Sequence, residues 1–155
     1  MGAEEKLKTS ITVYVVIKAG IDKVWKLWTQ PKHIRQWNKA SDDWHTTTAD
    51  NDLKPGGKFL YRTEAKDSRF GFDFSGVYDE IKKDELIALT LDDGRHLRIE
   101  FSGNSHETKV IETFDAEEVN SIEIQQGGWQ AILDNFKIYA EANEQSHASR
   151  ITGRF

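Results

Sequence analysis

The sequence predicts an α+β domain, in which a curved antiparallel sheet of six or seven strands wraps around a long C-terminal helix. Two observations support this prediction. Between about residues 43 and 115, apolar side chains alternate with a period of two and are interrupted by turn residues, which is typical of an antiparallel meander. After residue 120 the period becomes helical, and this long helix is available to cover the apolar face of the sheet.

The first elements are predicted to be a strand and two short helices. Residues 11–17 alternate and are rich in β-branched residues, which predicts a strand with four inward side chains: Ile11, Val13, Val15 and Ile17. Gly20 ends this strand. Four apolar residues then cluster at helical spacing and predict a helix over about residues 21–29: Val24, Trp25, Leu27 and Trp28. Pro31 suits the first turn of a second short helix, which ends at Trp37.

The middle of the chain is expected to contain only strands and turns. Pro55-Gly56-Gly57 and Asp93-Gly94 are the strongest turn signals. Between the turns we expect strands over Lys58–Glu64, Phe70–Tyr78, Leu86–Leu91, Leu97–Phe101 and Thr108–Phe114. In the second of these, one face carries Phe70, Phe72, Phe74, Gly76 and Tyr78.

The C-terminal helix is predicted from its cap and its apolar stripe. Asn120 is expected to cap the helix while Glu123 reaches back to it, as in a capping box. A single stripe then runs to a helix end near Asn143: Trp129, Ile132, Leu133, Phe136 and Ala140. Gly127 and Gly128 are expected to lie where the backbone passes close to another element, because glycine within a helix costs about 1 kcal/mol relative to alanine.

Length and composition limit the classes of protein to consider. The chain has 155 residues, no cysteine and a formal net charge of −5. It therefore has no disulfide, zinc–thiolate site or thiol nucleophile, and its charge argues against general nucleic-acid binding. There is no apolar run of the roughly 18–20 residues of a membrane span and no signal peptide. We expect a soluble, cytoplasmic single-domain protein: an N-terminal segment at 1–9, a domain at 10–143 and a flexible tail at 144–155.

Aromatic residues supply much of the apolar surface. Only 37% of the residues are hydrophobic, yet the chain contains five Trp, eight Phe and four Tyr. They either build the core or line a space that a ligand fills. A sheet wrapped around one helix can enclose such a space. The ligand-binding residues predicted from the inward faces are Trp37, Trp44, Phe59, Tyr61, Phe72, Phe74, Tyr78, Leu91, Phe101, Trp129, Leu133 and Phe136.

Several of these residues have two interpretations. Trp37 and Trp44 either form the mouth of a cavity or plug one end of the gap between helix and sheet. The hydroxyl groups of Tyr61 and Tyr78 either face a ligand or water inside the domain, or reach solvent at its rim. Gly76 either leaves room for a ligand or marks a bend in its strand.

The sequence predicts no catalytic residue, no metal site and no cofactor. Of the five histidines only His45, beside Trp44, is a candidate, and no histidine pair has metal-ligand spacing. Ser75 lacks the glycine pattern of a nucleophile elbow. An enzyme would need a titratable group inside the cavity, for which an inward-pointing Arg62 or His45 is the signal to seek.

Four stretches, in the same order, resemble the START-related helix-grip superfamily (SRPBCC), and within it the bacterial branch homologous to the activator of the heat-shock-protein-90 ATPase. They are Val24–Trp37, Gly56–Phe59, Phe74–Ile81, and Gly128-Trp129 followed by Leu133 and Phe136. The resemblance covers about residues 9–143 and implies the helix-grip (Bet v-like) fold. Members of this superfamily bind lipids, sterols or polyketides, some act as polyketide cyclases or dehydratases, and the eukaryotic relatives are co-chaperones.

From the aromatic faces and this resemblance, we expect non-catalytic binding of a small apolar or amphipathic molecule between sheet and helix. The alternatives are a cyclase- or dehydratase-type enzyme and a chaperone-associated stress-response module with a protein partner. The eukaryotic co-chaperone engages its chaperone largely through a separate N-terminal domain. Since this chain begins its first strand near residue 10, we do not expect it to activate a chaperone ATPase directly.

Overall fold

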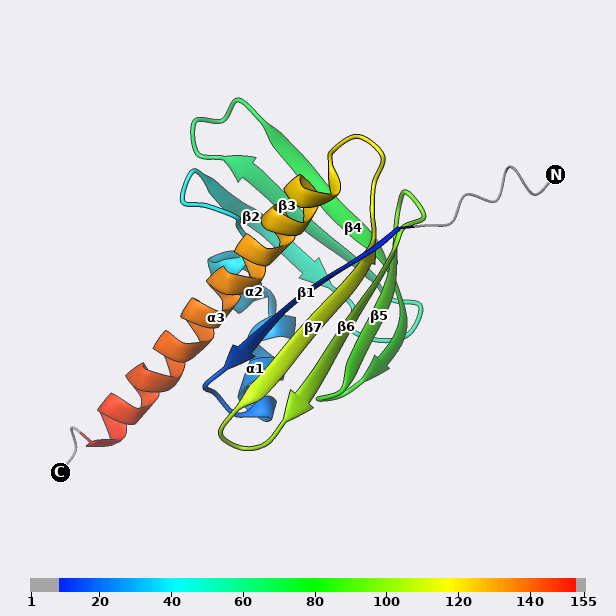
Figure 1. Ribbon diagram of the computed structural model, residues 1–155. Coiled ribbons are helices and arrows are strands. Elements are labelled where there is room, and N and C mark those ends of the chain that lie inside the picture. Colours follow the sequence, from blue (N-terminus) through cyan, green and yellow to red (C-terminus); the bar gives the residue numbers. More distant parts are fainter. Residues whose placement is uncertain (1–8, 153–155) are drawn as a thin grey trace.

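A computed structural model describes residues 9–152 of the chain (Figure 1). Its elements are β1 (Ser10–Ile17), α1 (Ile21–Thr29), α2 (Pro31–Trp37), β2 (Trp44–Asn51), β3 (Lys58–Ala65), β4 (Gly71–Lys82), β5 (Leu86–Leu91), β6 (His96–Gly103), β7 (Thr108–Asp115) and α3 (Ile122–Thr152). The strands form one antiparallel sheet in the order β1-β7-β6-β5-β4-β3-β2. This confirms the predicted fold class, with seven strands.

The two strands that flank the helix pair lie at opposite edges of the sheet. The segment containing α1 and α2 therefore carries the chain from β1 at one edge to β2 at the other. The sheet curls, and α3 runs across its concave side (Figure 1). The space between sheet and α3 is consequently bounded by strands on one side and by three helices on the other.

The predicted inward faces of the strands are confirmed at both ends of the meander. Along β1 every second residue is buried, beginning with Ile11 and ending with Ile17. In β6 the alternation is the same, with Leu97, Ile99 and Phe101 buried. Antiparallel pairing places these faces side by side and makes one continuous apolar surface.

Aromatic rings join the three helices. The ring centroids of Trp28 in α1 and Trp37 in α2 lie 4.8 Å apart, and each ring also lies 4.8 Å from that of Phe136 in α3. The indole N–H of Trp37 donates a hydrogen bond to the carbonyl oxygen of Leu27 at 3.0 Å. Trp37 is only 3% exposed, so it does not form an open mouth of the cavity.

The N-terminus of α3 differs from the prediction by one residue. The helix begins at Ile122, and the hydroxyl oxygen of Ser121 accepts a hydrogen bond from the backbone N–H of Ile124 at 3.1 Å. Asn120 is not the cap, because its backbone N–H and its side-chain amide both donate to the carboxylate of Glu117. The carboxylate of Glu117 thus binds Asn120, the residue that was expected to cap the helix.

The C-terminus of α3 also differs from the prediction. The helix does not end near Asn143 but continues to Thr152, so the backbone of residues 144–152 is helical and is not an irregular tail. The added stretch contains good helix formers, and no glycine or proline stops it before Gly153. Figure 1 shows the end of α3 extending beyond the sheet. Residues 1–8 and 153–155 lie outside the described residues.

The surroundings of three glycines bear on what was expected of them: of the two interpretations of Gly76, room for a ligand is excluded, and the expectation for Gly127 and Gly128 is wrong. A Cβ at Gly76 would lie 2.3 Å from the carbonyl oxygen of Thr90 and 3.1 Å from the ring of Phe59, so the neighbouring strand occupies this space and no ligand can. A Cβ at Gly127 or Gly128 would meet nothing within 4 Å, so the predicted close approach of the helix backbone is wrong. Neither position is packed against another element, and Gly128 borders the cavity described below.

Candidate binding cavity

A cavity of about 460 Å³ lies between the concave face of the sheet and α3. Side chains from the middle strands and from α3 form its wall, among them Phe59, Tyr61, Phe74, Tyr78, Ile87, Leu89, Leu97, Ile99, Trp129 and Ile132. Eight of the twelve predicted ligand-binding residues lie on this wall: Trp37, Trp44, Phe59, Tyr61, Phe72, Phe74, Tyr78 and Trp129. Their contact with a ligand stays a prediction.

The other four predicted residues belong to the packed core and not to the cavity wall: Leu91, Phe101, Leu133 and Phe136. Leu133 and Phe136 are fully buried. The ring of Phe101 packs edge-on against that of Trp25, with centroids 5.1 Å apart. Periodicity identified their inward faces correctly, but whether an inward side chain meets a neighbour or a void depends on the tertiary packing.

One edge of the cavity is formed by Trp44 and Phe72. Their ring centroids lie 5.8 Å apart, and Phe72 is 51% exposed. Phe70 was expected on the same inward face, but β4 begins at Gly71, and Phe70 lies before the strand with 68% of its surface exposed. Trp44 is therefore at the mouth of the cavity, whereas Trp37 lines a closed part of it.

Two tyrosines from adjacent strands meet inside the domain. The hydroxyl groups of Tyr61 and Tyr78 interact with each other, and that of Tyr61 also interacts with the side chain of Asn51. Tyr78 is only 3% exposed, so its hydroxyl does not reach the solvent-exposed rim. Burial raises the pKa of Tyr78 to about 12 and raises that of Tyr61 well above its ordinary value. Both phenols stay protonated at neutral pH and can donate hydrogen bonds.

The sequence analysis missed one titratable residue of the cavity wall, Glu112. It lies on β7 between Val110 and Phe114 in the row of inward residues, and it is only 5% exposed. Burial alone raises the pKa of its carboxyl group to about 8. The alternation from Thr108 to Phe114 predicts this inward position, so the signal was present in the sequence.

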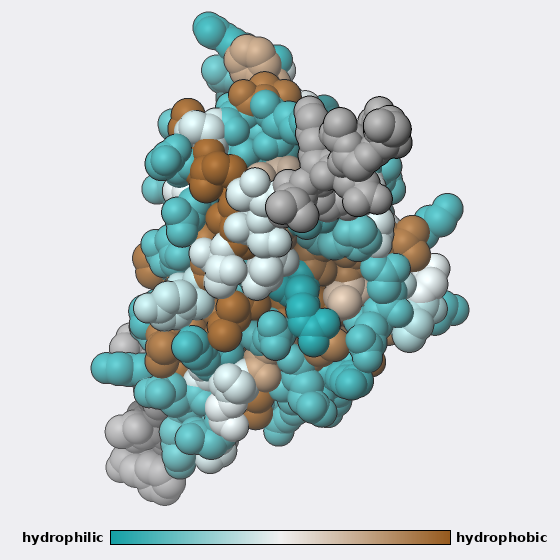
Figure 2. Space-filling model, turned by 45° about the vertical axis from the view of Figure 1, so that its right-hand side comes forward, coloured by the Kyte–Doolittle hydropathy of each residue, from teal (hydrophilic) through white to brown (hydrophobic). Residues whose placement is uncertain are grey.

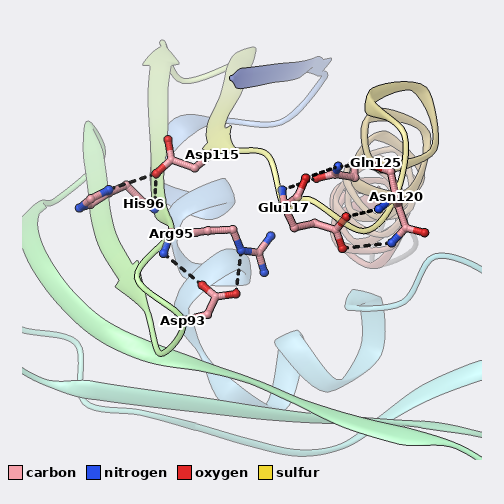
Figure 3. Close-up of polar contacts among 7 residues, drawn as sticks. All are labelled: Asp93, Arg95, His96, Asp115, Glu117, Asn120 and Gln125. Atoms are coloured by element: carbon pink, nitrogen blue, oxygen red, sulfur yellow. Dashed lines mark hydrogen bonds and ion pairs between the residues drawn. The ribbon is translucent and has the colours of Figure 1, made fainter. Parts of the chain in front are cut away.

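Polar side chains surround the second edge of the cavity, where the β5–β6 turn approaches the loop before α3 (Figure 3). Arg95 extends across this edge, and its Nε donates to the carboxylate of Asp93 at 2.8 Å. Glu117 accepts hydrogen bonds from Asn120, which together with the nearby Arg95 charge lower the pKa of the Glu117 carboxyl group. The side-chain amide of Gln125 ties this loop to α3 through two backbone carbonyl oxygens. This edge is thus polar and held by hydrogen bonds.

The residues named as signals of catalysis do not enter the cavity. His45 is exposed, and Arg62 forms ion pairs with Glu64 and Asp73 at 3.1 and 3.4 Å. His33 is partly buried, and its Nδ1 lies 2.6 Å from the hydroxyl oxygen of Tyr139, away from the cavity wall. Among residues 9–152, no group of three or more histidine and carboxylate side chains is placed to hold a metal ion.

No helix in the described part of the chain has the length and apolar character needed to cross a membrane.

A curved antiparallel sheet that grips a C-terminal helix, with two short helices after the first strand, defines the helix-grip class of proteins. Within this class the chain belongs to the family described as "Activator of Hsp90 ATPase homolog 1-like protein", which matches residues 18–141. The resemblance inferred from the sequence motifs is therefore confirmed.

Similar solved structures agree with this assignment. The solution structure of an AHSA1-like protein from Aeromonas hydrophila is 42% identical, and the match covers 88% of this chain and 94% of that chain with a TM-score of 0.82. The solution structure of Chr148 from Cytophaga hutchinsonii is 50% identical with the same coverage and a TM-score of 0.75. The crystal structure of CV1439 from Chromobacterium violaceum, at 20% identity, covers 86% and 98% with a TM-score of 0.77 and shows the fold alone. No curated protein matches the chain.

Proposed function

We propose that this protein binds a small apolar or amphipathic molecule in the cavity between the sheet and α3. The observation that supports this proposal is the cavity itself, whose volume of about 460 Å³ falls within the usual range of small-molecule sites. Its wall is mainly aromatic and aliphatic, with a few polar groups. Apolar contact supplies affinity at about 25 cal/mol per Å² of buried area, before the cost of association is subtracted.

The wall combines apolar area with a small number of polar groups, as binding sites for amphipathic molecules do. Phe59, Phe74 and Trp129 present flat apolar surfaces. The hydroxyl groups of Tyr61 and Tyr78 offer hydrogen bonds that can orient one end of a ligand. An apolar body with a polar end fits this distribution.

Native mass spectrometry of the freshly purified protein tests the proposal. We expect an adduct of a few hundred daltons that is lost on denaturation and can then be identified by extraction. Reloading the extracted compound provides the control. In Gly128→Phe the new ring enters the cavity wall and should reduce binding at least tenfold. Gly127→Phe places the same ring in open space outside that wall and should leave binding unchanged.

Absence of an adduct, together with equal behaviour of the two phenylalanine variants toward a panel of apolar compounds, would contradict the proposal.

A second candidate function is catalysis of the cyclase or dehydratase type, and one observation favours it. Glu112 is a titratable group inside the cavity with a pKa near neutrality, as general acid–base catalysis requires. An enzyme would convert the extracted compound on incubation, and Glu112→Gln would abolish turnover while the compound still binds. If the compound is unchanged after prolonged incubation with the wild-type protein, catalysis is excluded and binding remains as the proposed function.

A chaperone-associated role needs an exposed, contiguous apolar surface. On the face drawn in Figure 2, hydrophobic residues lie in separate groups among polar ones. On α3 the exposed hydrophobic side chains are Ile122 and Ile124 in the first turn and Ile138 about four turns further along the helix. The separate groups on the face in Figure 2 favour an internal ligand over a protein partner.

A further inference from the structure

Glu112 is a buried carboxyl group that faces the cavity without a partner. Its neighbours across the two adjacent strands are Val13 of β1 and Ile99 of β6, and both are buried apolar residues. Within the described part of the chain, no side chain or backbone group forms a hydrogen bond or ion pair with its carboxyl oxygens. A buried polar group without a partner costs free energy, so such a group inside a cavity indicates a ligand that supplies the missing partner.

The other charged groups on the cavity wall already have partners. Lys39 lies 3.3 Å from the carboxylate of Asp42, and Arg95 lies 2.8 Å from that of Asp93. The two remaining carboxylates, Asp73 and Glu117, contact Arg62 and Asn120 respectively.

The elements packed around Glu112 bring no charge to it. From α3 the wall receives only uncharged residues: Ile124, Gln125, Gly128, Trp129 and Ile132. From β6 it receives Leu97 and Ile99. From β3 and β4 the titratable residues of the wall are Tyr61, Tyr78 and Asp73. The two phenols are protonated at neutral pH, and Asp73 forms an ion pair with Arg62. The cations of the wall, Lys39 and Arg95, are both paired with aspartates, and no nearby charge offsets the effect of burial on the pKa of Glu112.

We propose that the cavity selects an apolar ligand that carries a hydrogen-bond acceptor, such as a ketone oxygen, and that the neutral carboxyl group of Glu112 donates a hydrogen bond to it. This inference rests on the proposed binding function and specifies its ligand class. A neutral donor and a neutral acceptor lose little hydration when they meet in an apolar space, whereas an amine and a carboxylate would both have to be stripped of water. The buried phenols are also donors, so the polar groups of the wall complement an acceptor.

The charge state of Glu112 agrees with this role. Burial raises the pKa of the carboxyl group to about 8, so at pH 6.5 it carries its proton and can donate. Above pH 8 the carboxylate can only accept, and it would repel a ketone oxygen. Affinity for an acceptor ligand should therefore fall as the pH rises through 8, whereas affinity for a hydrocarbon should not.

Three naphthalene probes of similar size test the inference: 2-acetylnaphthalene as acceptor, 1-(2-naphthyl)ethylamine as cation and 2-ethylnaphthalene as hydrocarbon. Their affinities are measured by calorimetry with the wild-type protein, Glu112→Gln and Glu112→Leu. At pH 6.5 we expect the ketone to bind the wild type about tenfold more tightly than the hydrocarbon does, since one hydrogen bond is worth about that factor. The glutamine amide also donates, so Glu112→Gln should keep the preference and remove its pH dependence. Glu112→Leu should lose the preference and bind the hydrocarbon unchanged or better.

The outcomes separate the failure of this inference from the failure of the binding function. If no probe binds, both the selection by Glu112 and the proposed binding function are contradicted. If the hydrocarbon binds as tightly as the ketone, or if glutamine and leucine variants bind the ketone equally, the cavity binds apolar molecules without selection by Glu112. If the amine binds best and Glu112→Gln abolishes that binding, the ligand is a cation and the inference is overturned.

Discussion

The indole ring of Trp129 on α3 stacks on the phenyl ring of Phe114 on β7, with ring centroids 4.0 Å apart and planes inclined by 19°. This contact anchors the helix to the sheet two residues along β7 from Glu112. The edge of Phe74 packs against the same indole ring, with centroids 5.9 Å apart. Trp129 therefore connects helix, sheet and cavity wall.

The stacked pair is expected to contribute to stability beyond the area that it buries. We predict that Trp129→Leu and Phe114→Leu each destabilise the fold by about 2 kcal/mol or more, because Phe114 is buried and Trp129 is partly buried against the core. In a double-mutant cycle measured by urea unfolding, the coupling between the two should be about 1 kcal/mol. Additive effects of the two substitutions would show that the stacking itself contributes nothing.

Glu112 should make stability decrease with rising pH. An unfolded Glu carboxyl loses its proton near pH 4.5, whereas burial in the folded state raises the pKa to about 8. Between these values the folded state binds more protons than the unfolded state, so the free energy of unfolding falls as the pH rises and levels off above 8. This pKa shift corresponds to a change in the free energy of unfolding on the order of 5 kcal/mol.

Urea unfolding of the wild type and Glu112→Gln at pH 5 and pH 8.5 checks this prediction. Because the amide does not titrate, the variant should gain stability relative to the wild type between the two pH values. Every other ionisable group is shared by both proteins and cancels in the comparison. An equal difference at both pH values would mean that Glu112 titrates normally in the folded protein.

Two glycines should respond to alanine with opposite signs. Gly76→Ala places a methyl group 2.3 Å from the carbonyl oxygen of Thr90 on the paired strand, so we expect a loss of at least about 2 kcal/mol. Gly127→Ala meets no atom within 4 Å and lies in helix α3, so we expect a gain of up to about 1 kcal/mol. Thermal and urea unfolding measure both effects, and a neutral Gly76→Ala would contradict the close approach of the two strands.

The hydrogen bond between His33 on α2 and Tyr139 on α3 joins two helices at a heavy-atom distance of 2.6 Å. Tyr139→Phe should lower the free energy of unfolding by about 1 kcal/mol at pH 7.5, because it removes only the hydroxyl group. Tyr14→Phe, at a 57% exposed tyrosine, is the matched control and should have little effect. Equal effects of the two variants would contradict a stabilising role for this bond.

The same histidine gives a second pH dependence. Burial, and then the positive charge of Lys32, lower the pKa of His33 below its ordinary value of 6.5. The unfolded state then binds a proton that the folded state excludes, so stability is lost as the pH falls below 6.5. An NMR titration of the His33 ring should give a midpoint below 6.5. A midpoint at or above 6.5 would contradict this prediction.

Much of the fold was predictable because it depends on local patterns. The alternation in β1 and β6, the Asp93-Gly94 turn and the stripe of α3 each follow from the spacing of neighbouring residues. The errors arose where local patterns compete. Ser121 caps α3 because Glu117 engages Asn120, and the helix passes Asn143 because its backbone needs no apolar stripe to continue.

The candidate site was predictable in outline but not in its chemistry. Phe136 and Trp129 belong to the same helical stripe, yet the first is sealed in the core by Trp28 and Trp37, and the second borders the cavity. Glu112 was predictable as an inward residue from the period of β7, but a carboxyl group is usually assigned to the solvent side. Glu112 is an exception to this rule because its partners on both adjacent strands are apolar, and only the strand register reveals those partners.

The sequence by itself determined the order of the elements, the face that each strand turns inward and the helix available to cover the sheet. These properties depend on residues a few positions apart, whose spacing sets the direction of each side chain. Only the tertiary structure decided which inward side chains touch one another and which border an empty volume. That distinction depends on the distance between α3 and a curved sheet, which is set by all the contacts between them together and is encoded in no single segment.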